Sequence, residues 1–360
     1  MFTDVESELA DGDTVLDADY ENETVNVEEY IISGYGADFD VFGLVRRLNQ
    51  KDIEIPDFQR AYVWNMQKAS RFIESLLMGL PVPGIFLYRE MGSQKLQVID
   101  GQQRLLSLQY YFKGCFPGTD QAFTLKGVGS RFDGFAYDDL PEESRRKLDD
   151  SIIRASIIHQ LAPDDNGSSR YSIFERLNTS STPLTPQEIR SAIFGGELDG
   201  LLADLNGNAS WRTLFGKVNA RMRDQELILR FLALYYDADN YSSPMKSFLN
   251  NFMSRHRNLT NLSENEIRRL FEKTVDSILE NIGERAFRPY NQVNAAVAES
   301  IMVGVARSLE KEVICSDLLS AYDDLRRNNA YSEAVASGTS QPANVRTRLK
   351  LATDAFATSK

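Results

Sequence analysis

The stretch VIDGQQRLLSLQ, residues 98–109, decides how the first half of the chain folds. Its apolar start is strand-like and ends at Asp100, a glycine follows at once, and the next residues have helical spacing. This order predicts a strand that turns through Gly101 into a helix. The packed side of that helix is predicted to carry Leu105, Leu108 and Phe112. Amphipathic packing requires none of the polar residues between Asp100 and Arg104, so we treat the junction as a candidate site.

The residues around the junction predict a mixed sheet. GIFLYRE and KLQVID, separated by the turn MGSQ, predict a β-hairpin over residues 84–100. Residues 24–35 predict a strand that runs into a glycine turn, and residues 152–158 predict a further apolar strand. Two amphipathic helices are predicted, one over residues 38–50 and one over residues 66–81 that stops at Gly79. The buried face of the first is predicted to contain Phe42, Leu44, Val45 and Leu48.

The second half of the chain is predicted to be helical. In LTPQEIRSAIFGG, Thr185 is placed as an N-cap, Pro186 as the first helical residue and Glu188 as its capping-box partner. From about residue 197 onward, one amphipathic segment follows another. We therefore predict an α+β protein with three parts: an acidic leader over residues 1–27, a mixed α/β domain over 28–196 and a helical domain over 197–360.

The charge of the chain is unevenly distributed. The first 40 residues contain 13 of the 52 acidic residues and no Lys or Arg, whereas the other 320 carry 40 basic and 39 acidic side chains. The leader is therefore predicted to be a solvated, flexible tail; alternatively, it lies over a basic groove and competes with a polyanion. The near-neutral remainder neither indicates nor excludes DNA binding, which depends on a local patch.

The composition is that of a globular cytoplasmic protein. No apolar run reaches the length of about 18 residues that a membrane helix needs, and the acidic start is unlike the basic start of a secretory signal. The two cysteines, Cys115 and Cys315, are far apart and have no metal-binding spacing. They suit a reducing compartment and are predicted to be packing residues. We therefore expect no membrane partner.

The opening junction has the residue types of a phosphate cradle. A glycine between a strand and a helix lets the main chain approach a ligand, and the first turn of the helix favours an anion. Arg104 can contact two phosphate oxygens, while Gln102 and Gln103 can position a water molecule. Asp100 can hold Mg²⁺ or orient that water. The alternative is an ordinary turn, in which Asp100 caps the helix and pairs with Arg104, and both glutamines face water.

Two further stretches bear on that choice. In IPDFQRAYVW, residues 55–64, Arg60 is a second candidate phosphate ligand, while Tyr62 and Trp64 either stack on a base or pack in the core. Trp64 is expected to be a core residue. In FERLNTSSTPLTPQEIR, residues 174–190, a loop rich in Asn, Ser and Thr separates two predicted helices. Glu188 in this stretch is already explained by the capping box.

The three stretches together resemble the family that forms the N-terminal half of GmrSD-type modification-dependent restriction enzymes. The resemblance rests on FQR, DGQQR and RLN motifs in this order, and it covers roughly residues 28–310. It implies a ParB/sulfiredoxin-like α/β core joined to a helical domain, and an association with nucleotide hydrolysis and antiphage defence. Carried over by position, the DGQQR motif falls on residues 100–104. The other two motifs place nucleotide-binding residues at Gln59, Arg60, Arg176 and Asn178.

One departure from that family concerns its nuclease. GmrSD-type enzymes carry an HNH-like domain that needs a histidine base beside metal ligands, but this chain has only His159 and His256. His159 ends an apolar strand-like run, and His256 lies near the end of a cationic helix. We therefore expect no HNH nuclease here, so that any DNA cleavage belongs to a partner subunit.

The combined expectation is a nucleotide-binding and slowly hydrolysing regulator that uses a nucleoside triphosphate and Mg²⁺. In this interpretation Asp100, Gln102, Gln103 and Arg104 are catalytic, and Gly101 brings the main chain close to the phosphates. The alternatives are a DNA-binding module without enzymatic activity and a module that docks a nuclease or another defence subunit. A metal-dependent nuclease is a weaker alternative, because Asp57 and Asp100 are the only carboxylates it could use.

Overall fold

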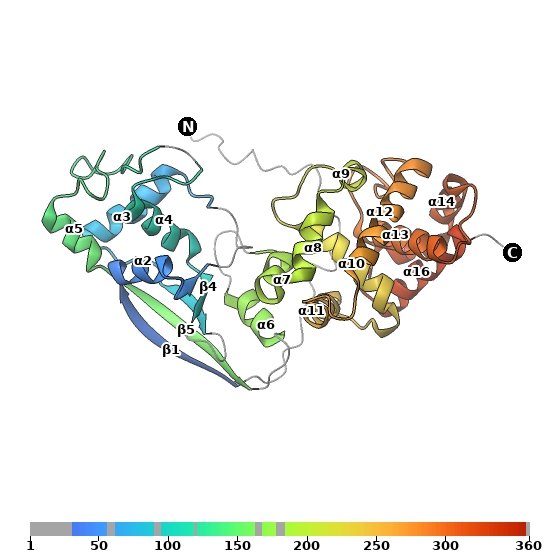
Figure 1. Ribbon diagram of the computed structural model, residues 1–360, viewed down its shortest axis with the longest axis horizontal. Coiled ribbons are helices and arrows are strands. Elements are labelled where there is room, and N and C mark those ends of the chain that lie inside the picture. Colours follow the sequence, from blue (N-terminus) through green and yellow to red (C-terminus); the bar gives the residue numbers. More distant parts are fainter. Residues whose placement is uncertain are drawn as a thin grey trace. The chain divides into compact units, whose positions relative to one another are not determined.

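The computed structural model describes residues 31–55, 62–89, 95–118, 121–162, 168–177 and 184–357, which form two compact units. The first unit contains the described residues up to 162 together with 169–177, and the second contains Ser168 and the described residues from 184 onward. Figure 1 shows that the first unit combines a sheet with helices and that the second is helical, which confirms the predicted fold class. The domain limits drawn from the sequence stay a prediction, and the leader lies outside the described residues.

The first unit is built on a five-stranded mixed sheet with the order β1-β5-β3-β4-β2. Its outer pair, β1 with β5, is antiparallel, while β5 runs parallel to β3 and β2 runs parallel to β4. The antiparallel pairing of β3 with β4 confirms the predicted hairpin. The strands are β1 (Ile31–Asp40), β2 (Ile53–Glu54), β3 (Ile85–Arg89), β4 (Leu96–Asp100) and β5 (Ile152–Ala162).

The predicted glycine turn near residue 34 is wrong. β1 continues through Gly34 and Gly36 to Asp40, with each residue paired along β5. Neither glycine has a positive φ angle, so neither bends the chain. Because β5 offers a partner along the whole length of β1, the hydrogen bonds of the ladder outweigh the weak strand preference of glycine.

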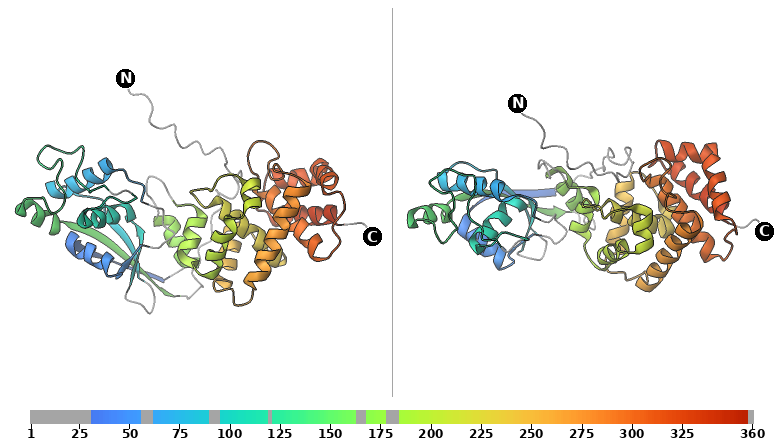
Figure 2. Two further views of the ribbon diagram at one scale, coloured as in Figure 1. Left: turned by 45° about the horizontal axis from the view of Figure 1, so that its top comes forward. Right: turned by 90° about the horizontal axis from the view of Figure 1, so that it is seen from above.

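Four helices cover one face of the sheet, as Figures 1 and 2 show. They are α2 (Val41–Asn49), α3 (Met66–Met78), α4 (Gln102–Lys113) and α5 (Glu142–Asp149). The sheet contributes alternate residues to the core beneath them, because successive side chains of a strand point to opposite faces. The helix α6 (Ser168–Leu177) follows β5 in the chain. Fully buried members of this core include Leu44, Ile73, Leu87, Val98, Leu105, Leu108 and Ile157.

The helix predictions hold in part at the level of single residues. α3 ends at Gly79, as predicted, and this glycine has the left-handed conformation that closes many helices. In α2, however, Phe42 is 54% exposed and Val41 takes the buried place. The side chain of Asp40 caps α2, so Val41 is its first residue and begins the buried row with i, i+3, i+4 and i+7 spacing. Phe42 lies one position outside that row.

The second unit begins with the predicted capping box. The Thr185 hydroxyl accepts from the Glu188 N–H, and the Glu188 carboxylate accepts from the Thr185 N–H. Its helices are α7 (Pro186–Phe194), α8 (Glu197–Asn206), α9 (Ala209–Phe215), α10 (Arg223–Asp237), α11 (Met245–Arg255), α12 (Glu264–Asn281), α13 (Ala295–Glu310), α14 (Leu318–Arg327), α15 (Asn329–Ala336) and α16 (Pro342–Phe356), with a 3₁₀ turn at Ala238–Asn240. Cys315 is half-buried, but Cys115 in the first unit is exposed, so the packing role predicted for Cys115 is wrong.

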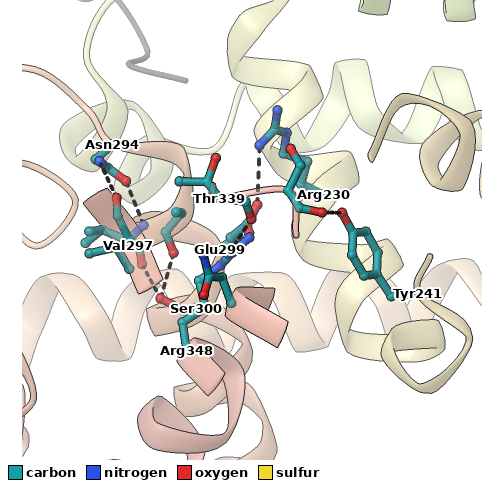
Figure 3. Close-up of polar contacts among 12 residues, drawn as sticks. Arg230, Tyr241, Asn294, Val297, Glu299, Ser300, Thr339 and Arg348 are labelled. Atoms are coloured by element: carbon teal, nitrogen blue, oxygen red, sulfur yellow. Dashed lines mark hydrogen bonds and ion pairs between the residues drawn. The ribbon is translucent and has the colours of Figure 1, made fainter. Parts of the chain in front are cut away.

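A buried ion-pair network joins α10, α13 and α16 (Figure 3). Glu299 of α13 accepts hydrogen bonds from Arg348 of α16, and an Arg230 nitrogen of α10 lies 3.6 Å from its second oxygen. Arg348 also donates to the Thr339 carbonyl oxygen at 2.6 Å. All three charged side chains are at most 3% exposed. Each charge has a partner, as buried ions require.

This network predicts a large effect of Glu299→Ala on stability. The variant leaves Arg230 and Arg348 buried beside each other without their shared carboxylate. Urea denaturation should therefore show a loss of about 3–5 kcal/mol in the free energy of unfolding. Glu264→Ala is the control, because its pair with Arg268 is half-exposed and such pairs contribute about 1 kcal/mol or less. Equal losses in the two variants would contradict this account of the network.

Candidate functional site

The turn between β4 and α4 requires glycine. Gly101 has a φ angle of +103°, which side-chain-bearing residues rarely adopt. A Cβ atom at this position would overlap Cγ2 of Ile85 in β3 and lie 3.0 Å from its Cβ. No side chain caps the amino end of α4. The sequence therefore brings the first turn of α4 directly against β3, with the positive end of the helix dipole at the turn.

Arg104 lies in that first turn, and only one of its guanidinium nitrogens forms hydrogen bonds with described residues. Its Nη2 donates to the Asp100 carboxylate and to the Gly84 carbonyl oxygen, both at 2.9 Å. The side chains of Arg104 and Asp100 are only 16% and 19% exposed. Nε of Arg104 is buried, and no hydrogen bond joins Nε or Nη1 to a described residue. The guanidinium group therefore keeps donors that these contacts do not satisfy.

The ordinary-turn alternative describes this junction only in part. Its ion pair between Asp100 and Arg104 is present. However, Asp100 does not cap α4, since the N-cap residue is Gly101. Gln103 does not simply face water either, because its Oε1 accepts from the main-chain N–H groups of Val63 and Trp64 at 2.9 and 3.3 Å. Gln102 is half-buried at the first position of α4.

A second contact holds the segment before α3 against α4. The Tyr62 hydroxyl lies 2.8 Å from the Ser107 hydroxyl, and Ser107 donates to the Gln103 carbonyl oxygen at 2.7 Å. Because a serine has one hydroxyl proton, Tyr62 must be the donor of the shared bond. Burial raises the pKa of Tyr62 to about 12, so the phenol keeps that proton at neutral pH. Trp64 packs edge-on against Phe72 at the rim of the core, as expected.

The other predicted site residues are not brought together in the described part of the chain. Gln59, Arg60 and Asn178 lie outside the described residues, as does Asp57. Arg176 is exposed in the last turn of α6, and no hydrogen bond or ion pair joins it to another described residue. Their roles stay predictions.

Two polar residues near the third motif have structural roles. Glu188 completes the capping box of α7 and pairs with Arg221. Arg190 is fully buried and bonds to Asn250, Gln187 and Glu226 in the helical unit. Their partners explain why polar side chains occur in this helix.

A groove between α2 and α4 was not foreseen from the sequence. It has a volume of about 460 Å³. Its lining residues are Phe42, Val45, Arg46, Asn49, Gln50, Gln109, Phe112 and Lys113. The lining of α4 begins five residues after Arg104, so the groove does not include the DGQQR turn. The one sequence feature that could have indicated the groove is Phe42, because this apolar residue lies outside the buried row of α2.

The candidate metal position consists of a single carboxylate. Among the described residues, no three His, Cys, Asp or Glu side chains are grouped as metal ligands. Asp100 alone can still fit Mg²⁺, which commonly takes one or two carboxylates, water and the phosphates of its substrate. His159 lies in β5, and His256 directly follows α11. The two histidines therefore belong to different units. No described helix combines the length and apolarity needed to cross a membrane.

The geometry of the turn predicts unequal costs for two alanine substitutions. Gly114 ends α4 with a φ angle of +74° and has open space where a Cβ would lie. Gly114→Ala should reduce the free energy of unfolding by about 1–2 kcal/mol through backbone strain alone. Gly101→Ala should cost about 3 kcal/mol or more, because overlap with Ile85 adds to the strain. Equal losses in denaturant titrations would show that the contact with Ile85 has no effect.

Comparison with known proteins places the junction in a family. Residues 41–195 match the model of the GmrSD restriction endonuclease N-terminal domain, and this range contains β4, α4 and the DGQQR turn. An uncharacterised protein of Methanocaldococcus jannaschii is 32% identical over 95 residues, which cover 20% of this chain. The chain spans only 16% of the length of that relative. The match confirms the resemblance seen in the motifs: residues 41–195 form a GmrSD restriction endonuclease N-terminal domain.

Proposed function

We propose that this protein is a nucleotide-dependent sensor or regulator in an antiphage or modification-dependent restriction system. It binds a nucleoside triphosphate at the turn between β4 and α4 and hydrolyses it slowly. The observation that carries the proposal is the buried, unpartnered Nε of Arg104 beside the uncapped start of α4. The family match supports the restriction context, because the matched domain contains this turn.

A buried hydrogen-bond donor without a partner destabilises the folded protein, which makes Arg104 a candidate ligand for an anion. Leaving a buried polar group without a partner costs about 1–3 kcal/mol. Nε is also buried without a hydrogen-bond partner in Arg89 and Arg212, but Arg89 ends β3, and Arg212 lies in the last turn of α9, whose start is capped by the Asn208 side chain. At the turn, by contrast, the dipole of α4 adds to the guanidinium charge, and Gly101 lets an oxygen approach the main chain. These features favour a phosphate group.

The remaining roles follow from the residue types at the turn. Asp100 would hold Mg²⁺ through one carboxylate oxygen, and the metal would supply charge neutralisation for the phosphates. Gln102 or Gln103 would orient the attacking water. Gln59, Arg60, Arg176 and Asn178 would complete the nucleotide contacts, as the family motifs imply. Hydrolysis would alter a conformation or an interaction with a partner subunit.

The proposal predicts that two substitutions abolish turnover. Phosphate release should be measured with ATP, GTP, CTP and UTP in the presence of Mg²⁺, with and without modified DNA. Arg104→Ala removes the proposed phosphate ligand, and Asp100→Ala removes the proposed metal ligand. Each should lower kcat/KM at least about a hundredfold, the scale on which single electrostatic contacts act in phosphoryl transfer.

The control is Arg131→Ala, which removes an exposed arginine of the same unit that is far along the chain from the turn. It should leave turnover unchanged, and circular dichroism should show that all three variants remain folded. Wild-type turnover that survives both Asp100→Ala and Arg104→Ala would exclude the turn as the nucleotide site.

The second candidate function is a docking module, and the groove between α2 and α4 favours it. The groove combines exposed Phe42 with the cations Arg46 and Lys113. Exposed aromatic side chains within such a depression are typical of interaction surfaces. The occupant would be a nuclease or another defence subunit. A DNA-binding module is the other form of this alternative, and its affinity would fall steeply with added salt.

The docking function predicts a separation of two activities. Phe42→Ser and Lys113→Glu should reduce the amount of nuclease subunit that co-purifies with the tagged full-length protein. Phosphate release should stay at the wild-type rate, because neither residue lies at the β4–α4 turn. The exposed Leu319 of the helical unit provides the matched control, Leu319→Ser. Unchanged co-purification in the groove variants would exclude the groove as the docking surface.

A further inference from the structure

We propose that Gln103 is a positioning residue, which fixes the main chain at Val63 and Trp64 against the first turn of α4. The inference deepens the triphosphate hydrolysis proposed above and rests on it. It gives Gln103 the task of holding the main chain of the site in place, which leaves its side-chain oxygen without capacity to orient the attacking water.

The side-chain oxygen of Gln103 already accepts two hydrogen bonds from the main chain. It accepts from the Val63 N–H at 2.9 Å and from the Trp64 N–H at 3.3 Å. An amide oxygen has two lone pairs, so these two bonds account for its acceptor capacity. A water molecule that attacks a phosphate must give up a proton toward an acceptor. Gln103 could serve that water only by releasing the main chain of the neighbouring segment.

Packing alone does not hold this segment at Val63. The Val63 side chain is 63% exposed, so it contributes little to the core. Polar contacts on one face of α4 therefore hold the segment in addition to the packing of Tyr62 and Trp64 against the core. Gln103 and Ser107 are four residues apart and therefore adjacent on that face, and Tyr62 donates to Ser107 one turn further along. Tyr110, the next residue on the face, meets the Tyr62 ring edge-on with 5.3 Å between ring centroids.

The first turn of α4 thereby connects two parts of the unit. Arg104, about 100° around the helix from Gln103, donates to the carbonyl oxygen of Gly84, the residue directly before β3. Gln103 holds the segment that follows the FQR motif in the chain. Loss of the Gln103 contact would therefore change the position of this segment relative to Arg104. Orientation of groups around a reacting phosphate affects rate strongly, which gives a positioning residue a measurable effect.

The first test measures the contact without any nucleotide. Hydrogen–deuterium exchange of the full-length protein should be followed on peptides that contain residues 62–66. Gln103→Leu removes both acceptor bonds, so the amides of Val63 and Trp64 should exchange at least about tenfold faster. Gln103→Glu keeps a side-chain oxygen at the same place and should stay close to wild type. Unchanged exchange in Gln103→Leu would overturn the proposal.

The second test distinguishes positioning from direct catalysis by a double-mutant cycle on phosphate release. Tyr62→Phe breaks the neighbouring contact without touching Gln103 or Arg104. If both residues act by holding the same segment, each single variant raises KM for the triphosphate. The double variant then raises it less than the product of the two single effects. If Gln103 acts on the water itself, Gln103→Leu and Gln103→Glu both lower kcat and Tyr62→Phe changes neither constant, which would overturn the proposal.

Failure of the proposed triphosphate hydrolysis is distinguishable from failure of this inference. Absence of turnover in the wild-type protein would reject the proposed function and with it the kinetic role of Gln103. The exchange experiment needs no turnover, and it alone decides whether Gln103 fixes the main chain at residues 63 and 64.

Discussion

The left-handed turn at Gly101 is the constraint on which the α/β unit depends. It lets α4 start directly after β4 and lie against Ile85 of the neighbouring strand, where any side chain would overlap. This close approach sets the rotation of α4 about its axis. Leu105 and Leu108 then face the core, Arg104 faces the start of β3, and Gln103 faces the segment before α3. A single residue without a side chain thus fixes the position of every polar group in the turn.

Arginines in this protein illustrate two ways in which a buried charge can be compensated. Arg348 of the helical unit has the Glu299 carboxylate and a main-chain carbonyl as partners. The protein itself supplies the partners of this guanidinium group, which is consistent with a structural role. Arg104 has a carboxylate and a carbonyl as well, yet both bind the same nitrogen and leave Nε buried without a partner. Incomplete compensation beside a helix start is what distinguishes a candidate anion ligand from a structural ion pair.

The parts of the fold that depend on local chemistry could be predicted from the sequence. Gly79 ends α3 and Thr185 begins α7 because the residues that cap a helix lie within a few positions of its end. The predicted turn at Gly34 failed because the outcome there depends on a partner distant in the chain. β1 continues through Gly34 because β5, more than 100 residues later, pairs with it. The error at Phe42 had a local cause: Asp40 caps α2, so the buried row begins at Val41, one residue before the position that the apolar pattern suggested.

The location of the candidate site could be predicted from the sequence, but the contacts of its side chains could not. The DGQQR residues indicated a polar turn between a strand and a helix, which the structure confirms. No sequence pattern could show that Gln103 binds the main chain 40 residues earlier, because main-chain N–H groups carry no sequence signal. The groove between α2 and α4 was missed for a related reason. Its walls come from two helices whose pairing is set by the sheet beneath them.

The most direct test of the account is a crystal structure of the protein with a non-hydrolysable nucleoside triphosphate and Mg²⁺. We predict phosphate oxygens within hydrogen-bond distance of Nε or Nη1 of Arg104, with the triphosphate at the amino end of α4. A triphosphate bound elsewhere in the molecule, with Arg104 still bonded only to Asp100 and Gly84, would contradict the account.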